Sequence, residues 1–230
     1  MIQIAHELKT PLTSILGWAE LLYNAKKQGD NLDAFFKLED LLSIFRNAER
    51  LNILISEFLD MGRFEHGMFE IVKVQANFSN ILENALKAVD NLAAEKAIRI
   101  TIDAVPFVNL CVDRRRMEQV IIHLLTNAIK YSPEKTRVTI KANIEEHNAH
   151  KMLRVRVIDE GYGFEIEELS NATTPFAKAY TRQQQKRVVL GSGLGLYISR
   201  GIIEQHGGTL EIRSDGANCG TQIEIFLPID

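Results

Sequence analysis

The chain has 230 residues, a length that allows one large domain or two small ones. Its 27 lysines and arginines against 30 aspartates and glutamates give a net charge of −3, which excludes a chain built to coat nucleic acid or an anionic membrane. With 46% hydrophobic residues, only two cysteines and no apolar run near the roughly 18 residues of a membrane span, the chain is not a collagen, a disulfide scaffold, a channel or a disordered tail.

The first third of the chain has the pattern of two long amphipathic helices. From Ile4 onward the apolar residues fall on one narrow arc of a helix, until Gly29–Asn31 break the pattern. The pattern resumes as a heptad seam made of Leu38, Leu41, Phe45, Ala48, Asn52, Ile55 and Leu59. A helical hairpin cannot enclose a core by itself, so the seam needs a partner, and a second copy would complete a four-helix bundle.

Beyond Gly67 the pattern changes to short strands interleaved with helices. We expect strands at residues 71–74, 98–102, 108–112, 137–144, 153–158, 210–213 and 221–227. We expect helices at residues 78–95, 113–131 and 194–206. Ser79 is a candidate cap of the first helix, and His206 ends the last, a position where the helix dipole favours a histidine. These elements predict an α+β fold in which helices cover one face of a mainly antiparallel sheet.

The first helix carries a histidine in a reactive setting. His6 and Thr10 lie one turn apart on the side away from the apolar arc, and Glu7 follows His6. An exposed imidazole beside a carboxylate has the features of a nucleophile, because a carboxylate that accepts from Nδ1–H leaves Nε2 free to attack. Pro11 removes a backbone donor from the same helix. The alternative is an exposed histidine with an unrelated glutamate beside it.

Three later segments carry groups suited to a nucleotide. A glycine-rich segment opens a helix, where backbone N–H groups suit phosphate; it consists of Gly191, Gly193, Leu194, Gly195 and Leu196. Asp159 follows a strand and precedes Gly161 and Gly163, so its carboxylate can accept a hydrogen bond from an exocyclic amine such as that of adenine. The end of another helix supplies an amide oxygen, an ammonium and an aromatic ring from Asn127, Lys130 and Tyr131.

These motifs resemble those of the sensor histidine kinases of two-component systems. His6–Leu12 is similar to their H-box, and Asn127 with Lys130 and Tyr131 is similar to their N-box. The later family boxes are matched in order by Asp159, Gly161 and Gly163, by Phe176, by Gly191–Leu196, and by Gly220–Thr221. The motifs follow the order of the family and extend over nearly the whole chain.

The resemblance implies two domains. Residues 1–66 would form the dimerisation and histidine phosphotransfer hairpin, as half of a dimeric four-helix bundle, and residues 67–230 a catalytic α/β sandwich of the Bergerat ATP-binding type. By the same resemblance His6 takes the γ-phosphoryl group of ATP, Glu7 assists as base or acceptor, and Thr10 positions water in a reverse phosphatase reaction.

The resemblance also implies ATP and Mg²⁺ as cofactors. Asn127 would hold the metal ion, Asp159 would read the adenine amine, and Thr221 would support the adenine end through water. Residues 177–190 correspond to a mobile lid. Its Arg182, Lys186 and Arg187 are candidates for phosphate contacts, but the favoured interpretation is a solvated basic loop. The implied partners are a second copy of the chain, bound through the hairpin, and the receiver domain of a response regulator, with no nucleic acid.

The start of the chain inside a helix predicts a fragment of a longer protein. We expect this catalytic piece to be cytoplasmic, and the parent to reach a membrane only through an upstream segment that the fragment lacks. Handedness of the hairpin loop, within 23–33, decides between phosphorylation within one subunit and between two, and the sequence does not show it.

One position departs from the family pattern. His123 stands where a second Asn is usual, and imidazole is a poor ligand for Mg²⁺. The alternative function is therefore a dimeric ATP-binding signalling module with weak or no catalysis. A third hypothesis, an ATPase of the gyrase and mismatch-repair type, is poor, because those enzymes place a glutamate base at the position of His123.

Overall fold

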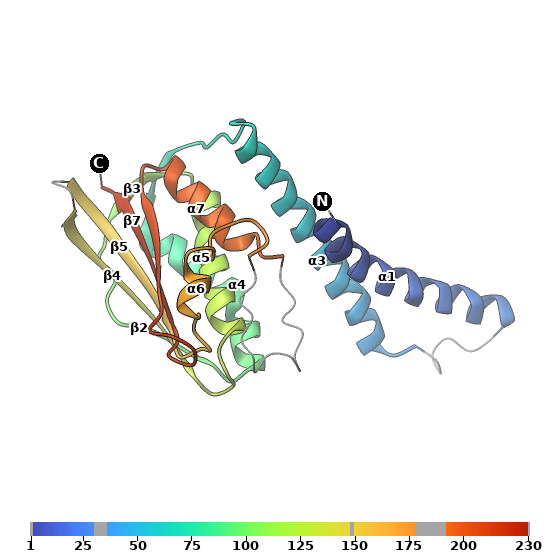
Figure 1. The fold of residues 1–230 in the computed structure, drawn as a ribbon. Coiled ribbons are helices and arrows are strands. Elements are labelled where there is room, and N and C mark those ends of the chain that lie inside the picture. The colour runs from blue at the N-terminus through green and yellow to red at the C-terminus, as the bar shows by residue number, and fades with distance from the viewer. Residues whose placement is uncertain (1, 30–35, 148–149, 178–191, 230) are drawn as a thin grey trace. The chain divides into compact units, whose positions relative to one another are not determined.

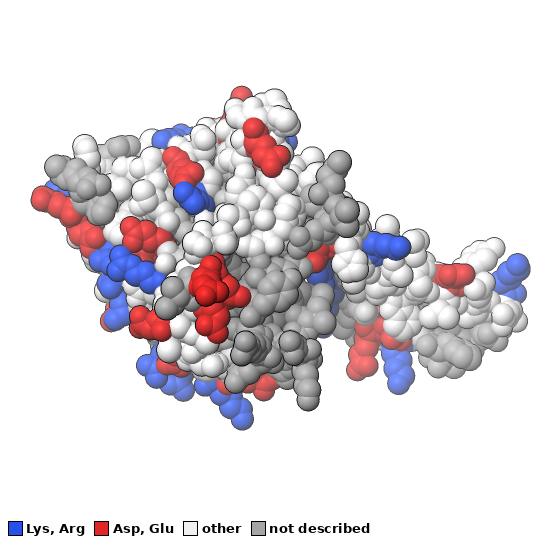
Figure 2. Space-filling view, in the orientation of Figure 1, with Lys and Arg blue, Asp and Glu red and all other residues white. Residues whose placement is uncertain are grey.

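The chain folds into two compact units. The computed structural model describes residues 2–29, 36–147, 150–177 and 192–229. The units are Met1–Gly67, a pair of long helices, and Met68–Asp230, a sheet with helices against one face (Figure 1). None of the described helices is long and apolar enough to cross a bilayer. Acidic and basic side chains both occur across the face drawn in Figure 2, in keeping with the small net charge.

The first unit is a helical hairpin. Helix α1 spans Ile2–Gln28 and helix α3 spans Leu38–Glu65. The Asn47 side-chain amide of α3 donates to Ser14 Oγ of α1 at 3.4 Å, so a polar contact joins the two helices. Pro11 lies inside α1, and the helix continues through it although one backbone donor is missing.

The heptad seam of α3 does not pack within one hairpin. Every residue of the seam is exposed, including Phe45 with 58% and Leu59 with 54% of its surface accessible. Leu12 and Leu16 of α1 are exposed as well. Large apolar side chains gathered in water mark an interaction surface. The hairpin therefore presents an apolar surface that its own two helices leave uncovered.

The second unit contains two sheets and the α+β arrangement predicted from the sequence is confirmed. The five-stranded sheet has the order β2 (Arg99–Ile102), β4 (Arg137–His147), β5 (His150–Asp159), β7 (Thr221–Pro228) and β6 (Thr209–Arg213). Only β2 and β4 are parallel among these neighbours. A separate antiparallel pair consists of β1 (Val74–Asn77) and β3 (Asn109–Val112). The helices are α4 (Phe78–Glu95), α5 (Arg114–Lys130), the short α6 (Ile166–Leu169) and α7 (Gly195–Gln205).

The core lies between the five-stranded sheet and the helices. In β7 Ile223, Ile225 and Leu227 are buried and share one face of the strand, and the other face carries Gln222, Glu224 and Phe226. The helices contribute a matching apolar stripe, which in α5 comprises Met117, Val120, Ile121, Leu124, Leu125, Ala128 and Ile129. Burial of this kind stabilises a fold by about 25 cal/mol for each Å² of apolar surface removed from water.

Two local predictions are wrong, for reasons visible in the hydrogen bonds. The cap of α4 is Asn77 rather than Ser79, since Asn77 Oδ1 accepts from the Ser79 N–H at 3.0 Å. The first strand of the unit is 74–77 rather than 71–74, because the Val72 N–H donates to Asp113 Oδ2 instead of to a neighbouring strand. The short α6 was not predicted, because four residues are too few for a helical period.

His206 is the C-cap of α7, which confirms its predicted place at a helix end, but its contacts differ from those of a side chain held there by the helix dipole. His206 is only 2% exposed, its Nδ1 lies 2.7 Å from the Ile202 carbonyl, and its Nε2 accepts from the Asp113 N–H at 2.9 Å. A ring nitrogen that accepts a hydrogen bond carries no proton, so the imidazole is neutral. Burial lowers the pKa of His206 and the nearby Lys73 acts in the same direction, while the hydrogen bond with the Ile202 carbonyl and the charge of Asp113 oppose the shift.

This buried imidazole predicts a loss of stability in mild acid. An unfolded histidine takes up a proton as the pH falls through about 6.5, whereas folded His206 does so only at lower pH, so the unfolded state binds more protons and gains relative stability. Between pH 7.5 and 6.0 the free energy of unfolding of the second unit should fall, as measured by urea titration. The variant His206→Gln cannot titrate and should show a shallower slope. Equal slopes for the two proteins would contradict the assignment.

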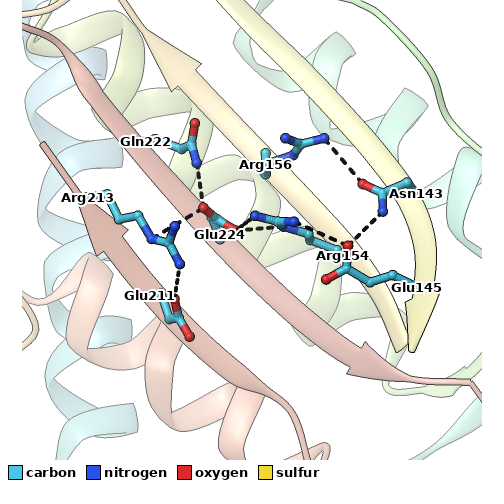
Figure 3. A network of polar contacts seen from close by, with 8 residues as sticks. All are labelled: Asn143, Glu145, Arg154, Arg156, Glu211, Arg213, Gln222 and Glu224. Carbon is cyan, nitrogen blue, oxygen red and sulfur yellow. Dashed lines mark hydrogen bonds and ion pairs between the residues drawn. The ribbon is translucent and has the colours of Figure 1, made fainter. Parts of the chain in front are cut away.

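The sheet face away from the helices carries a network of charged side chains (Figure 3). Glu224 at its centre is fully buried, and the Arg154 Nε and Nη2 both bind its Oε2, at 2.7 and 2.6 Å. Gln222 donates to Oε1 of the same carboxylate, and Arg213 Nε lies 3.6 Å from it. These donors compensate the cost of burying the Glu224 carboxylate.

Removal of Glu224 should therefore be costly for stability. Glu224→Ala removes the buried partner of the Arg154 guanidinium, which keeps its ion pair with Glu145 at 3.2 Å. The expected loss is about 2–3 kcal/mol of unfolding free energy, below the fully buried case because Arg154 is partly exposed and retains one partner. Glu211→Ala is the matched control, because Glu211 pairs with the exposed Arg213 and should cost under about 1 kcal/mol. Urea denaturation of both variants measures the difference. Equal losses would show that burial of the pair contributes nothing.

Candidate functional site

The candidate nucleotide site centres on Asp159 at the end of β5. Its Oδ1 accepts two backbone hydrogen bonds, from Gly161 N at 2.8 Å and from Thr221 N at 3.1 Å. Thr221 is the register partner of Asp159 on β7, which explains why the two residues meet. Within the described part of the chain, Oδ2 receives no hydrogen bond. One oxygen of the carboxylate is thus held in place and the other remains for a ligand.

Burial alters the chemistry of this carboxylate. Asp159 is 7% exposed, and the loss of water raises its pKa to about 6, although the N–H groups of Gly161 and Thr221 oppose the shift. The group is therefore mostly ionised at neutral pH and can accept a hydrogen bond from an amine. The Thr221 hydroxyl beside it has no partner among the described residues, so it is available to hold water.

Gly161 lets the backbone after β5 pass close to the Asp159 carboxylate and the Tyr131 carbonyl. A Cβ at this position would lie 2.5 Å from Asp159 Oδ1 and 2.7 Å from the Tyr131 carbonyl oxygen, so no larger residue fits without displacing one of them. Gly163 has φ +67, a conformation that favours glycine, and its Cβ would overlap the Gly216 carbonyl. Gly161 is therefore required for steric reasons, and Gly163 for steric and conformational ones.

The end of α5 forms the neighbouring wall. Asn127, Lys130 and Tyr131 are half-buried there, and the Lys130 ammonium lies 5.5 Å from the centre of the Tyr131 ring. Burial raises the pKa of the Tyr131 phenol, so it stays neutral. The Asn127 side-chain amide makes no hydrogen bond to any described residue, and its oxygen is of the type that Mg²⁺ prefers.

His123 lies one turn before Asn127 and faces α7. Its Nδ1 is 3.4 Å from Ser199 Oγ, and its ring would be about 3.6 Å from a Cβ on Gly195. The imidazole therefore packs against the first turn of α7. No cluster of three or more His, Cys, Asp or Glu side chains that could hold a metal occurs among the described residues. A Mg²⁺ ion fits this donor set only as a companion of phosphate oxygens and water, with the Asn127 amide as protein ligand.

The glycine-rich segment adjoins Phe176. Phe176 N donates to the Gly193 carbonyl at 3.0 Å, and a Cβ on Gly193 would lie 2.8 Å from the Ala177 carbonyl oxygen. Leu194 is the N-cap of α7 and is buried, and Gly195 and Leu196 form its first turn. Other predicted residues lie outside the described part of the chain: Gly191, the lid up to Leu190, and its Arg182, Lys186 and Arg187.

The candidate phosphoacceptor lies on α1. His6 is exposed, and its carbonyl oxygen accepts from Thr10 Oγ1 at 3.1 Å. No hydrogen bond joins the His6 imidazole to Glu7. The Glu7 carboxylate instead lies 3.6 Å from the Arg50 guanidinium of α3. Arg50 was not predicted, because its position on α3 carries no motif and its partner is on another helix.

The comparisons with known proteins match two family models, one for each unit of the chain. Residues 112–230 match the family model of the histidine kinase-, DNA gyrase B- and HSP90-like ATPases, and residues 3–67 match that of the histidine kinase A phosphoacceptor domain. The chain is 30% identical over its whole length to the non-motile and phage-resistance protein of Caulobacter vibrioides and 27% identical to histidine protein kinase DivJ of that organism. It spans only 27% and 37% of the lengths of these two proteins.

Solved structures support the fold. The Acinetobacter baumannii histidine kinase AdeS matches with a TM-score of 0.72 at 23% identity, with 98% of each chain covered. The histidine kinase ThkA, in a complex with the response regulator protein TrrA, matches with a TM-score of 0.66 at 21% identity, over 100% of this chain and 60% of that one.

Proposed function

This chain belongs to the sensor histidine kinases of two-component systems, and from that premise we propose that it transfers the γ-phosphoryl group of ATP to His6 and then to an aspartate of a response regulator. The observation that carries the proposal is the occurrence in one chain of an exposed histidine on α1 and a buried carboxylate with one unoccupied oxygen, Asp159. We place this catalytic part in the cytoplasm, where ATP and receiver domains are present.

We assign ATP to the pocket beside Asp159. Oδ2 of Asp159 accepts from the adenine amine, and the Thr221 hydroxyl reaches the base through water. Lys130 and the backbone N–H groups of Gly193, Gly195 and Leu196 bind the phosphates, while the Leu194 N–H donates to Ser192 Oγ and Leu194 packs beneath them. Gly191 is assigned to the same group on the family motif alone. Asn127 holds Mg²⁺, which neutralises charge on the phosphates when it is bound.

His6 is the phosphoacceptor in this proposal. Its Nε2 forms a bond to the γ-phosphorus while the bond to the bridging oxygen breaks, and ADP leaves with that oxygen. Nε2 must be unprotonated, so the ring proton sits on Nδ1, and Glu7 accepts a hydrogen bond from it. The Glu7 carboxylate lies 3.6 Å from the Arg50 guanidinium, and this ion pair must break before Glu7 can accept from His6. Arg50 therefore holds Glu7 in its resting position.

Thr10 serves the reverse reaction. Its hydroxyl proton is directed to the His6 carbonyl, which leaves the lone pairs of Oγ1 free to hold a water molecule on the exposed face of α1. That water would attack the phospho-aspartate of the response regulator and release inorganic phosphate. We assign the binding site of the receiver domain to the surface of α1 around His6. Both phosphotransfer from His6 and hydrolysis of the phospho-aspartate require the receiver domain at this surface.

We propose that the exposed heptad seam of α3 binds a second copy of the chain. The apolar residues of the seam repeat with heptad spacing along α3 and are exposed in a single hairpin. Such a stripe is what packs in the centre of a four-helix bundle. Residues 1–66 are then the dimerisation and phosphotransfer domain and residues 67–230 the catalytic domain.

The seam can be tested by placing a charge in it. Phe45→Glu should convert a dimer into monomers, because symmetry brings the two carboxylates together in an apolar interface. Sedimentation velocity at micromolar concentration measures this. Ile53→Glu is the matched control, since Ile53 is equally exposed at 57% but lies off the seam, and it should leave the dimer intact. A monomeric wild-type chain, or dissociation by Ile53→Glu alone, would contradict the proposed seam.

The alternative function is a dimeric ATP-binding module with little or no catalysis. His123 in place of an oxygen ligand is the observation that favours it. Incubation with ATP labelled at the γ-phosphate separates the two functions: a kinase acquires label that withstands alkali and is lost in acid. A chain that binds ATP and acquires no label would support the silent module instead.

A further inference from the structure

One lysine outside the nucleotide site makes an unusual set of contacts with it. Lys96 follows α4 directly and is half-buried. Its Nζ donates to three backbone carbonyls at the end of α5: Ile129 at 2.9 Å, Lys130 at 2.9 Å and Ser132 at 2.7 Å. An ammonium has three protons, so these contacts use its full donor capacity.

The carbonyls that Lys96 binds need an outside partner. The last carbonyls of a helix have no N–H within the helix, and the helix dipole places partial negative charge on them. Lys96 supplies both the donors and a compensating positive charge. The backbone of Lys96 adds a second link, because its carbonyl accepts from Lys135 N at 3.0 Å. The turn after α5 is therefore attached to Lys96 at both ends.

The buried side chain in this turn does not help to hold it. Ser132 is fully buried, yet its hydroxyl has no hydrogen-bond partner among the described residues. The turn is held through its backbone, and the Lys96 ammonium donates the hydrogen bond to the Ser132 carbonyl. Loss of the ammonium would leave that carbonyl and the last turn of α5 without their donor.

The same turn forms part of the nucleotide site. Asn127, Lys130 and Tyr131 belong to the helix end that Lys96 caps. The Tyr131 carbonyl accepts from Tyr162 N at 3.0 Å and would lie 2.7 Å from a Cβ on Gly161, so its position sets that of the loop after Asp159. A shift in the turn would therefore move both walls of the pocket.

We propose that Lys96 is a positioning residue for ATP: without touching the nucleotide, its ammonium holds the end of α5 in the geometry that the ligand requires. The inference rests on the proposed nucleotide site beside Asp159. Preorganisation of this kind improves affinity because the pocket does not have to be ordered when the ligand binds.

The test compares two lysine variants of the full chain. Lys96→Met keeps the apolar stem and removes the donors, and it should weaken the binding of ATP by about tenfold, since small displacements of binding groups have large effects. Lys87→Met is the matched control, because Lys87 lies on α4, nine residues before Lys96, and forms an exposed ion pair with Glu83. The affinity of this variant for ATP should match that of the wild type. Titration with a fluorescent ATP analogue at 10 °C, with the folded state checked by circular dichroism, measures both.

The affinity of the folded variant for ATP distinguishes a positioning role of Lys96 from a role in stability alone. If Lys96→Met melts at a lower temperature but binds ATP as tightly as the wild type while folded, the inference is overturned. Should the methionine variant not fold, Lys96→Gln, which keeps two donors and no charge, allows the same comparison. A wild-type chain that does not bind ATP, or an Asp159→Ala variant that binds it normally, would instead refute the proposed nucleotide site.

Discussion

The variant His6→Gln is expected to acquire no phosphate when incubated with ATP and Mg²⁺, whereas the wild-type chain acquires phosphate that withstands alkali and is lost in acid. A phosphoryl group on an imidazole nitrogen has this stability profile, and one on serine or threonine does not. Glutamine keeps the size and polarity of an exposed side chain on α1 but has no nucleophilic nitrogen. The loss should therefore be complete rather than partial.

The control is a second exposed histidine. His66 lies at the end of α3, and His66→Gln should label as the wild type does. ATP affinity should be unchanged in His6→Gln, because the nucleotide groups belong to the other unit of the chain. Alkali-stable label that persists in His6→Gln would place the phosphoacceptor elsewhere and refute the assignment.

Local features of the fold were predictable because they depend on neighbours in sequence. Helix α4 begins and ends at the residues predicted for it, since its apolar period and its flanking polar residues are contained in the segment itself. The predicted helix over residues 113–131 is α5 with its two caps, Asp113 and Tyr131, included. Such signals need no knowledge of the tertiary structure.

Long-range contacts were not predictable in the same way. His206 was predicted to end a helix and does so, but the hydrogen bond that its Nε2 accepts from the Asp113 N–H, 93 positions away, was not predicted. Lys96 and Arg50 were missed because their partners lie on other helices and neither residue sits in a motif. A single sequence records the type of a side chain and not its partner, so contacts of this kind become visible only in the structure.

The candidate site falls between these two cases. Asp159 and the glycines after it were predicted from a strand followed by a turn, and the structure adds why Gly161 must be glycine. The hydrogen bond from Thr221 to Asp159 joins residues 62 positions apart, through the register of β5 and β7. The residue types could be predicted from the motif, and their convergence on one carboxylate oxygen could not.

Asp159→Ala should abolish measurable ATP binding while the dimer remains. The raised pKa of Asp159, about 6 against 3.8, means that the folded chain disfavours the ionised form by roughly 3 kcal/mol at neutral pH. A carboxylate kept at such a cost serves something other than stability, and here it is left with one free oxygen. Calorimetric titration with ATP measures the loss, and sedimentation velocity checks the dimer. Unchanged affinity would refute the adenine assignment.

The same pKa predicts how binding varies with pH. Only the ionised carboxylate accepts well from the adenine amine, and its ionised fraction falls as the pH drops through about 6. ATP affinity should therefore decrease by about tenfold between pH 7 and pH 5, as protons compete for the same oxygen. Asp159→Asn cannot titrate, so it should bind more weakly at pH 7 and retain only the pH dependence of the phosphates. If the wild type and Asp159→Asn showed parallel profiles, the titrating group that controls binding would lie elsewhere than on β5.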